Sequence, residues 1–182
     1  MLFFTVVVSI VIIQRIIELA IAKRNEKWMR RQGAFEAGAE HYPLMVMMHI
    51  AFFVSLIMEV AMLDRPLSPL WHFLLPIFLL AQVMRVWCLS SLGKFWNTKI
   101  LVMPGADVVR KGPYKWLRHP NYVVVSIEIL VLPLLFSAYF TAFVYSLLNI
   151  WMLSVRIPTE EKALRETTDY EERFSLKKHP AK

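Results

Sequence analysis

The sequence predicts an all-α integral membrane protein with about five transmembrane helices. Of its 182 residues, 57% are hydrophobic, and they cluster in long runs instead of alternating with charged residues. A run of about 20 apolar residues is long enough to cross the hydrocarbon core of a bilayer as a helix. A chain of this length favours a single domain, which we expect to cover residues 1–182.

Three of the predicted spans lie in residues 1–92. They correspond to the apolar runs 2–22, 43–63 and 70–92. The polar stretch between the first two, residues 23–42, begins with a cluster of Lys and Arg. We expect it to form an interfacial helix followed by a loop.

The other half of the chain, residues 93–182, begins with a long polar loop. A helical hairpin follows, made of the apolar runs 121–136 and 139–155, and the first of these is shorter than a full span of about 20 residues. Pro158 is expected to end the last helix, because proline cannot donate a backbone hydrogen bond. In the polar tail, residues 168–171 have the spacing of a capping box and predict a short terminal helix.

The distribution of basic residues predicts the orientation in the membrane. Five spans with an outside N-terminus bring the basic segments 23–31, 94–118 and 156–178 to one side, while the other keeps only Asp64 and Arg65. Cytoplasmic loops carry an excess of Lys and Arg, so we expect a multi-pass protein of the plasma membrane whose long loop and C-terminus are cytoplasmic. The net charge of +7 is then explained by basic residues of cytoplasmic loops, which lie beside anionic lipid headgroups, rather than by a nucleic-acid partner.

The sequence favours neither a metal nor a phosphate-loop nucleotide site. Cys88 is the single cysteine, and no spacing of Cys and His is typical of zinc ligands. A Gly-rich phosphate loop is absent as well. We therefore expect no metal, and any nucleotide-like cofactor must be held by other means.

A candidate site lies where the hairpin begins and ends. Residues 110–128 read RKGPYKWLRHPNYVVVSIE, in which basic and aromatic side chains run directly into an apolar helix. That helix contains Glu128, and a charge there costs about 3 kcal/mol or more, so a function or a partner such as Arg118 or Arg85 is expected. Together with the carboxylates that follow the last span, these groups predict a binding site at the membrane boundary.

The segment GPYKWLRHPNY, residues 112–122, followed by an apolar hairpin and Arg-x-x-x-Glu-Glu at 156–161, resembles the isoprenylcysteine carboxyl methyltransferase family and its phospholipid methyltransferase relatives. The resemblance covers residues 92–161. In detail the chain is most similar to short bacterial members, some of which methylate long-chain phenolic or pyrone polyketides. Where the family usually has Gly two residues after the motif Tyr, this chain has Val124, which implies a slightly different pocket.

The resemblance implies S-adenosylmethionine as the methyl donor and a lipid-like acceptor that enters from the bilayer. The expected activity is O-methylation of a carboxylate, as in an isoprenylcysteine-like compound, or of a hydroxyl, as in an alkyl-pyrone or phenolic lipid. Glu160 and Glu161 suit the ammonium of the donor, and Arg118, Arg156 or His119 suit its carboxylate.

The remaining predicted contacts involve rings and backbone. Tyr114 and Tyr122 offer aromatic faces to the adenine or the sulfonium. Backbone groups of Val108, Val109 and Gly112 are expected to bind the adenine edge.

Catalytic roles are expected for Arg156 and Glu128. A carboxylate acceptor needs no general base. For a phenol or an enol, the candidates for a general base, on residue type alone, are Glu128, His41 and His49.

Other interpretations of these residues remain open at the level of sequence. An NADPH-dependent membrane lipid reductase is one, since sterol reductases carry a similar His-Pro-Asn-Tyr segment, although Gly-Glu typically follows it there and three valines follow it here. A non-enzymatic membrane adaptor is another. Arg156 and Glu160 are also spaced as an exposed helical pair, and Glu160 and Glu161 as acids in the first turn of a helix.

Overall fold

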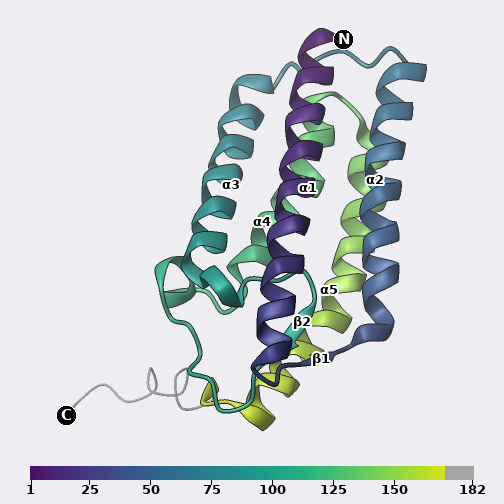
Figure 1. The fold of residues 1–182 in the computed structure, drawn as a ribbon. Helices are drawn as coiled ribbons and strands as arrows, with labels where there is room; N and C mark the ends of the chain where they lie inside the picture. The colour runs from purple at the N-terminus through teal and green to yellow at the C-terminus, as the bar shows by residue number, and fades with distance from the viewer. Residues whose placement is uncertain (171–182) are drawn as a thin grey trace, which may run out of the picture.

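The computed structural model describes residues 1–170 as a bundle of helices that run alternately up and down (Figure 1). The helices are α1 (Leu2–Arg31), α2 (Tyr42–Met62), α3 (Trp71–Leu92), α4 (Pro120–Leu135) and α5 (Tyr139–Thr167). In this part of the chain, α1, α2, α3 and α5 are long and apolar enough to cross a membrane, and α4 is a shorter apolar helix of 16 residues. The predicted fold class, an all-α integral membrane protein, is confirmed.

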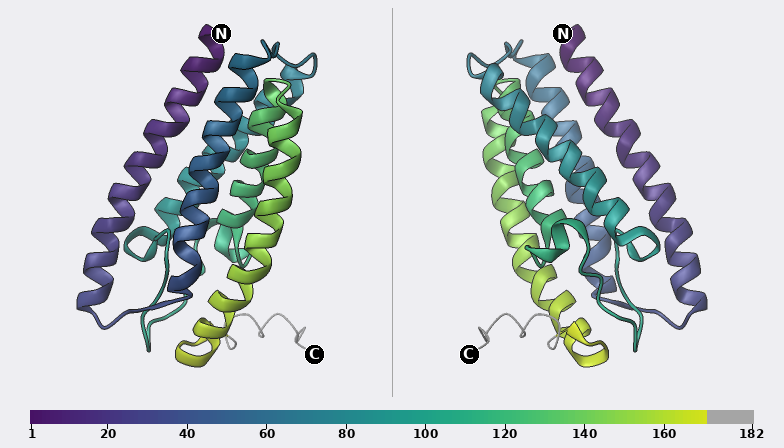
Figure 2. Two further views of the ribbon diagram at one scale, coloured as in Figure 1. Left: turned by 90° about the vertical axis from the view of Figure 1, so that its right-hand side faces the viewer. Right: turned by 90° about the vertical axis from the view of Figure 1, so that its left-hand side faces the viewer.

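The predicted hairpin of the last two spans is present. Helix α4 packs between α3 and α5, and only residues 136–138 separate it from α5. Ser137 turns the chain with a φ of 54°. Figure 2 shows that α1, by contrast, diverges from the other helices towards its C-terminal end. The long loops gather at that end of the bundle, which we call the loop end.

The apolar core fills the half of the bundle away from the loop end. Near the N-terminus of α1, the ring of Phe4 meets that of Phe136 edge to face, with 4.9 Å between centroids. Leu56 of α2 and Leu132 and Leu135 of α4 are almost completely buried there. Side chains three and four apart on a helix share a face, which is why these apolar runs supply both a core face and a lipid face.

A buried carboxylate holds the start of α5. Glu59 of α2 accepts hydrogen bonds from the backbone N–H groups of Phe140 and Thr141, at 3.2 and 2.8 Å, and from the Thr141 hydroxyl at 2.8 Å. It also pairs with Arg65 at 3.3 Å. The first N–H groups of a helix have no partner within the helix, so Glu59 satisfies them from a neighbouring element.

The prediction of a separate interfacial helix after the first span is wrong, because α1 continues unbroken to Arg31. The loop that follows α3 holds this extension. Asn25 donates to the carbonyls of Gly93 and Trp96 at 3.0 and 2.7 Å, and Asn97 donates to the carbonyl of Ala22 at 3.0 Å. These long-range bonds dock the polar end of α1 onto the loop.

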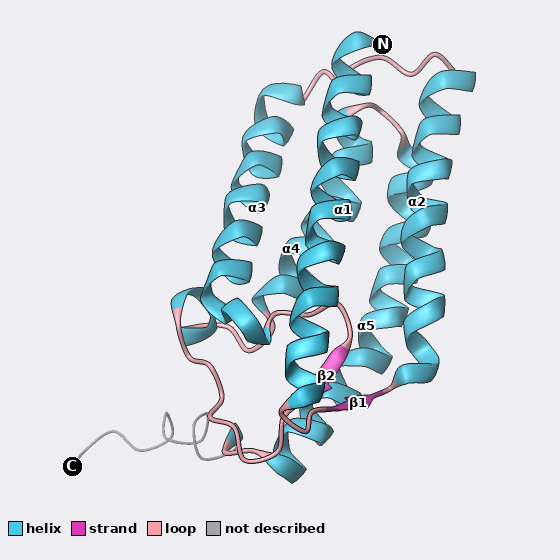
Figure 3. Cartoon of the chain, viewed as in Figure 1, coloured by secondary structure: helices cyan, strands magenta, loops and turns pink. Residues whose placement is uncertain are grey.

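A small antiparallel ribbon at the loop end was not predicted (Figure 3). Strand β1 (Phe35–Ala37) pairs with β2 (Ile100–Val102), with Phe35 opposite Val102. Short 3₁₀ turns complete the loops, namely η1 (Ala39–His41), η2 (Gly93–Phe95) and η3 (Gly112–Lys115). Strands of three residues are too short to show the alternation that identifies a strand in a sequence.

The prediction that Pro158 ends the last helix is also wrong, because α5 runs through this residue to Thr167. The extension is held by tertiary packing, since Ala163 is buried against Ile100 and Val102 of β2. Glu160 and Glu161 therefore lie in the interior of a long helix and not in its first turn. The terminal helix predicted from residues 168–171 extends past Tyr170 and so lies outside the described residues.

Candidate functional site

A cavity of about 370 Å³ occupies the loop half of the bundle. Each helix that borders it contributes side chains at helical spacing, as Asn149, Arg156 and Glu160 do on α5 and Tyr122, Val125 and Ile129 do on α4. Cavities of 300–1,000 Å³ are typical of sites for small molecules. The cavity is large enough to be a ligand site.

The lining changes character along the cavity. The loops and helix ends contribute polar and aromatic side chains, whereas the membrane-spanning parts contribute apolar ones together with the charge network of Arg15, Arg85 and Glu128. The apolar lining residues include Ile12, Met45, Phe53, Ile129 and Leu132. This division suits an amphiphilic ligand with a polar head and a hydrocarbon tail.

The residues of the Arg-His-Pro-Asn-Tyr segment meet the two carboxylates of α5. The Tyr122 hydroxyl donates to Glu160 at 2.6 Å, and the His119 ring stacks on the Tyr122 ring with 5.5 Å between centroids. His119 also lies with Nε2 3.1 Å from Glu161 and Nδ1 3.7 Å from Glu160. Four of the predicted cofactor-binding residues are thus in one cluster, although about 40 residues separate the two segments in the sequence.

The two adjacent glutamates face different surroundings. Glu160 lines the cavity, whereas Glu161 is not part of its lining. Glu161 pairs with Arg165 at 2.9 Å and with Arg118 at 3.7 Å, and it accepts a bond from the Tyr170 hydroxyl at 3.3 Å. Burial, together with the nearby Glu161 carboxylate, raises the pKa of Tyr170 to about 12, so this hydroxyl stays a neutral donor.

Arg156 lies in the wall of the cavity and is only 4% exposed, so it does not belong to an exposed helical pair. One of its terminal nitrogens donates to the Thr98 carbonyl at 3.0 Å. Its Nε is buried without a hydrogen-bond partner among the described residues, and so is Oδ1 of Asn121, which lines the same cavity. Buried polar atoms are nearly always paired, so this donor and this acceptor indicate a place for a ligand.

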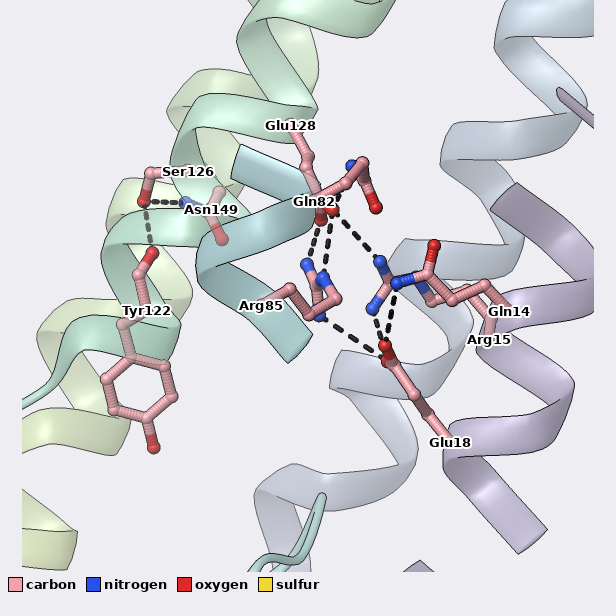
Figure 4. A network of polar contacts seen from close by, with 9 residues as sticks. All are labelled: Gln14, Arg15, Glu18, Gln82, Arg85, Tyr122, Ser126, Glu128 and Asn149. Carbon is pink, nitrogen blue, oxygen red and sulfur yellow. Dashed lines mark hydrogen bonds and ion pairs between the residues drawn. The ribbon is translucent and has the colours of Figure 1, made fainter. Parts of the chain in front are cut away.

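Glu128 is the centre of a buried charge network that joins α1, α3 and α4 (Figure 4). It forms a bidentate ion pair with Arg85, whose Nε lies at 2.9 Å, and it accepts bonds from Gln82 at 2.6 Å and Arg15 at 3.0 Å. Glu18 bonds the same two guanidinium groups. Of the two partners considered for Glu128, Arg118 and Arg85, it is Arg85 that pairs with it in the structure. Two cations and two anions in contact satisfy one another inside the membrane.

Tyr114 and Tyr122 both line the cavity, as do Arg118 and His119. The Tyr114 hydroxyl lies beside the Cys88 thiol. Burial is the main cause that raises the pKa of Tyr114, and the thiol is the second, so Tyr114 offers a neutral phenol. Val124 is buried in a cluster with Ala81 and Cys88, against α3. The family glycine is thus replaced by a side chain that packs between helices and not into the cavity.

The loop backbone that the sequence suggested for the adenine edge lies outside the cavity lining. Val108, Val109 and Gly112 are not part of the cavity lining, and the N–H of Val108 donates to Asp169 at 2.9 Å. Gly112 has a φ of +53°, and a Cβ atom there would collide with the hydroxyl of Ser91 and lie 2.7 Å from Nε1 of Trp87. Gly112 lets η3 approach α3 closely, which positions the segment that follows.

Gly112→Ala is therefore expected to destabilise the protein by about 1–3 kcal/mol more than Gly105→Ala. Both glycines have a positive φ, but no atom lies within 4 Å of a Cβ at Gly105, so the pair separates steric overlap from backbone strain. Thermal unfolding in detergent measures the difference. Equal midpoints for the two variants would show that η3 can move away from α3 without cost.

Several lining residues were not identified from the sequence. They include Tyr42, Trp96, Thr98, Lys99, Asn121 and Asn149. The Lys99 ammonium lies 5.3 Å from the centroid of the Tyr42 ring, and it pairs with Glu26 at 2.9 Å. Two of them carry a signal that the sequence could have supplied: Asn121 belongs to the Arg-His-Pro-Asn-Tyr segment, and Asn149 is an amide within an apolar span.

A bundle of helices long and apolar enough to span a membrane, with a cavity that carries this motif cluster, defines the class: an integral membrane protein with a ligand-sized site. The model of the isoprenylcysteine carboxyl methyltransferase (ICMT) family matches residues 74–166, about half of the chain and the part that carries the motif cluster. The chain belongs to the ICMT family.

Two bacterial relatives extend the similarity over nearly the whole chain. An uncharacterized protein of Bacillus subtilis, YpbQ, is 50% identical over 163 residues, which are 90% of this chain and 97% of that protein. An uncharacterized protein of Haemophilus influenzae is 30% identical over 165 residues, which are 90% of this chain and 96% of that protein. No solved structure matches the chain significantly.

Proposed function

We propose that the protein transfers the methyl group of S-adenosylmethionine to an oxygen atom of a lipid-like acceptor held in the membrane. The observation that carries this proposal is the polar end of the cavity. There Arg156 and Asn121, whose Nε and Oδ1 are buried without a hydrogen-bond partner among residues 1–170, line the same cavity as Glu160.

The residues present suit the chemical groups of the donor. Arg156 supplies a guanidinium for the amino-acid carboxylate, and Glu160 supplies a carboxylate for the ammonium. The rings of Tyr114 and Tyr122 provide π faces for the adenine or the sulfonium. When bound, the donor supplies an electrophilic methyl group.

The neighbours of Glu160 act by positioning it. His119 and Tyr122 both contact its carboxylate, and His119 is in turn contacted by Glu161, which pairs with Arg118. The carboxylate thus keeps one orientation when the donor arrives. The backbone from Val108 to Gly112 supports this arrangement from outside the cavity, in place of the adenine contact expected from the sequence.

The apolar end of the cavity is the proposed place for the acceptor tail. Methyl transfer from a cation to an anionic or electron-rich oxygen loses charge on the way to the transition state. A dry pocket that aligns the two reactants therefore favours the reaction. In our proposal Glu128 acts through the charge network, by holding Arg85 and Arg15 at the cavity wall.

We also propose that the loop end faces the cytoplasm and that the protein resides in the plasma membrane. The basic segments predicted to be cytoplasmic belong to the C-terminal part of α1, the loop after α3 and the end of α5, all of which lie at the loop end (Figure 1). A water-soluble donor would then reach the polar end of the cavity from the cytoplasm.

The proposal predicts that the detergent-purified protein binds S-adenosylhomocysteine, the demethylated product, with micromolar affinity in a calorimetric titration. NADPH is the matched competitor and is expected not to bind. Binding of NADPH in place of S-adenosylhomocysteine would assign the cavity to a lipid reductase. If neither compound bound, the proposed donor site would be contradicted.

A further inference from the structure

The turn that leads from η3 to α4 exposes apolar side chains outside the membrane-spanning helices. Trp116 is 66% exposed and Leu117 is 43% exposed, and neither belongs to the cavity lining. An exposed apolar patch usually marks a surface that meets a partner, because its burial is favourable. The turn directly precedes Arg118 and His119, which line the cavity, so a partner that covers the turn also affects the position of these two residues.

The patch continues the exposed apolar surface of α3. Leu80, Val83 and Trp87 are three and four residues apart, so they share one face of the helix, and all three are exposed. A face of this kind on a membrane-spanning helix meets lipid tails. The Trp116 ring lies beside the Trp87 ring, with 5.9 Å between centroids. Trp116 therefore extends the lipid-facing surface of α3 towards the loop end.

The depth of the turn corresponds to the level of the lipid headgroups. Helix α3 has 22 residues, so it is about 33 Å long, close to the thickness of a hydrocarbon core of about 30 Å. Trp87 lies only about 8 Å before the last residue of this helix, Leu92. Tryptophan is enriched at this level in membrane proteins. The close approach of Gly112 to Ser91 and Trp87 holds η3 against α3 at the same level.

Two lysines beside the apolar patch supply positive charge. Lys111 and Lys115 are exposed, and no carboxylate among residues 1–170 pairs with either of them. Arg118 does not add to this charge, because it pairs with Glu161. Asp107 is the only acidic residue in segment 107–119. Exposed basic side chains at a membrane surface attract anionic phospholipids, so the charge and the apolar patch fit the same partner.

We propose that residues 111–117 form an interfacial anchor, in which Trp116 and Leu117 insert among the lipid headgroups and the two lysines hold anionic phospholipid. The anchor positions the donor site, and this role rests on the proposed methyltransferase function. Lipid bound to the anchor restrains the turn, and the turn restrains His119. His119 in turn contacts Glu160, the carboxylate proposed for the donor ammonium, with Nδ1 at 3.7 Å.

The first test measures the depth of the turn in the full-length protein in lipid nanodiscs. Leu117→Cys is labelled with a fluorophore, and the native Cys88 does not compete for the label because it is completely buried. A lipid that carries a spin label near its headgroup is expected to quench this fluorophore strongly. Glu166→Cys is the control, because the Glu166 side chain is 61% exposed and lies about 40 Å along α5 from Tyr139, beyond the hydrocarbon core.

The fluorophore at the control position is expected to be quenched by aqueous iodide and only weakly by the spin-labelled lipid. Equal quenching by the lipid at both positions would overturn the proposal. A fluorophore at position 117 that neither quencher reaches would also overturn it, since a second copy of the chain would then cover the turn.

Donor binding supplies the second measurement. S-adenosylhomocysteine carries one ammonium and one carboxylate and has no net charge, so an anionic surface does not concentrate it. Its dissociation constant is expected to be about fivefold or more lower in nanodiscs of phosphatidylcholine and phosphatidylglycerol than in phosphatidylcholine alone. Lys111→Gln/Lys115→Gln is expected to abolish this difference. Lys111→Arg/Lys115→Arg, which keeps both charges, is expected to retain it.

Lys23→Gln/Lys94→Gln is the matched control, because it removes the same charge from exposed lysines of α1 and η2. It is expected to keep the full dependence on lipid charge. Equal affinity of the wild type in both lipids, or the same loss in both glutamine variants, would contradict the anchor. Failure to bind S-adenosylhomocysteine in either lipid would contradict the proposed function instead, and the quenching measurement would still show whether the turn enters the membrane.

Discussion

Glu128→Leu is expected to destabilise the folded protein by about 3–5 kcal/mol, because it leaves the buried Arg85 and the partly buried Arg15 without their shared carboxylate. Arg85 is only 3% exposed, so water cannot replace the lost partner. Unfolding of the reconstituted protein in increasing fractions of SDS measures the loss.

The matched control is the double variant Arg85→Leu/Glu128→Leu. It removes one charge of each sign and leaves Arg15 paired with Glu18. Because replacing a whole buried ion pair by apolar side chains is often neutral, we expect the double variant to be more stable than Glu128→Leu alone. A double variant that is no more stable than the single one would show that Glu128 stabilises the bundle in some way other than through its charge.

Arg156→Met is expected to weaken S-adenosylhomocysteine binding by about 10- to 150-fold, because a hydrogen bond to a charged group contributes about 1.5–3 kcal/mol. Glu160→Gln is expected to weaken it by at least tenfold, since Glu160 lines the cavity. Glu161→Gln should have a smaller effect, because Glu161 is not part of the cavity lining and contacts the lining residue His119. Calorimetric titration of each purified variant gives the dissociation constants.

Lys162→Met is the control for these variants, because Lys162 is a basic residue of the same helix whose side chain is 77% exposed and pairs with Glu166. It is expected to bind like the wild type. A larger loss for Glu161→Gln than for Glu160→Gln would reverse our assignment and place the donor ammonium at the outer carboxylate.

The fold class and the positions of the spans were predictable because they depend on composition along one segment at a time. The runs 43–63 and 70–92 became α2 and α3 with boundaries shifted by a residue or less. The short hairpin was predictable for the same reason, since residues 136–138 leave too little chain for anything else. Errors arose where a distant segment decided the outcome, as when β2 packed against Ala163 and α5 continued past Pro158.

At the candidate site, too, the sequence predicted what depends on residue type and local order. The sequence alone identified Glu160, His119 and Tyr122 as members of one site, because their types and order match a motif of the ICMT family. It also showed that Glu128 needs a partner, since an unpaired charge is costly in a membrane.

By itself, then, the sequence determined that this is a membrane-spanning helical protein of the ICMT family with a polar site at one end of its bundle. Only the tertiary structure decided that Glu160 lines the cavity while Glu161 contacts His119, and that Arg85 pairs with Glu128. The physical reason is that hydrophobicity along the chain specifies which segments enter the membrane. The rotation of each helix, and the distant partner that each polar group meets, depend on how all the helices pack together.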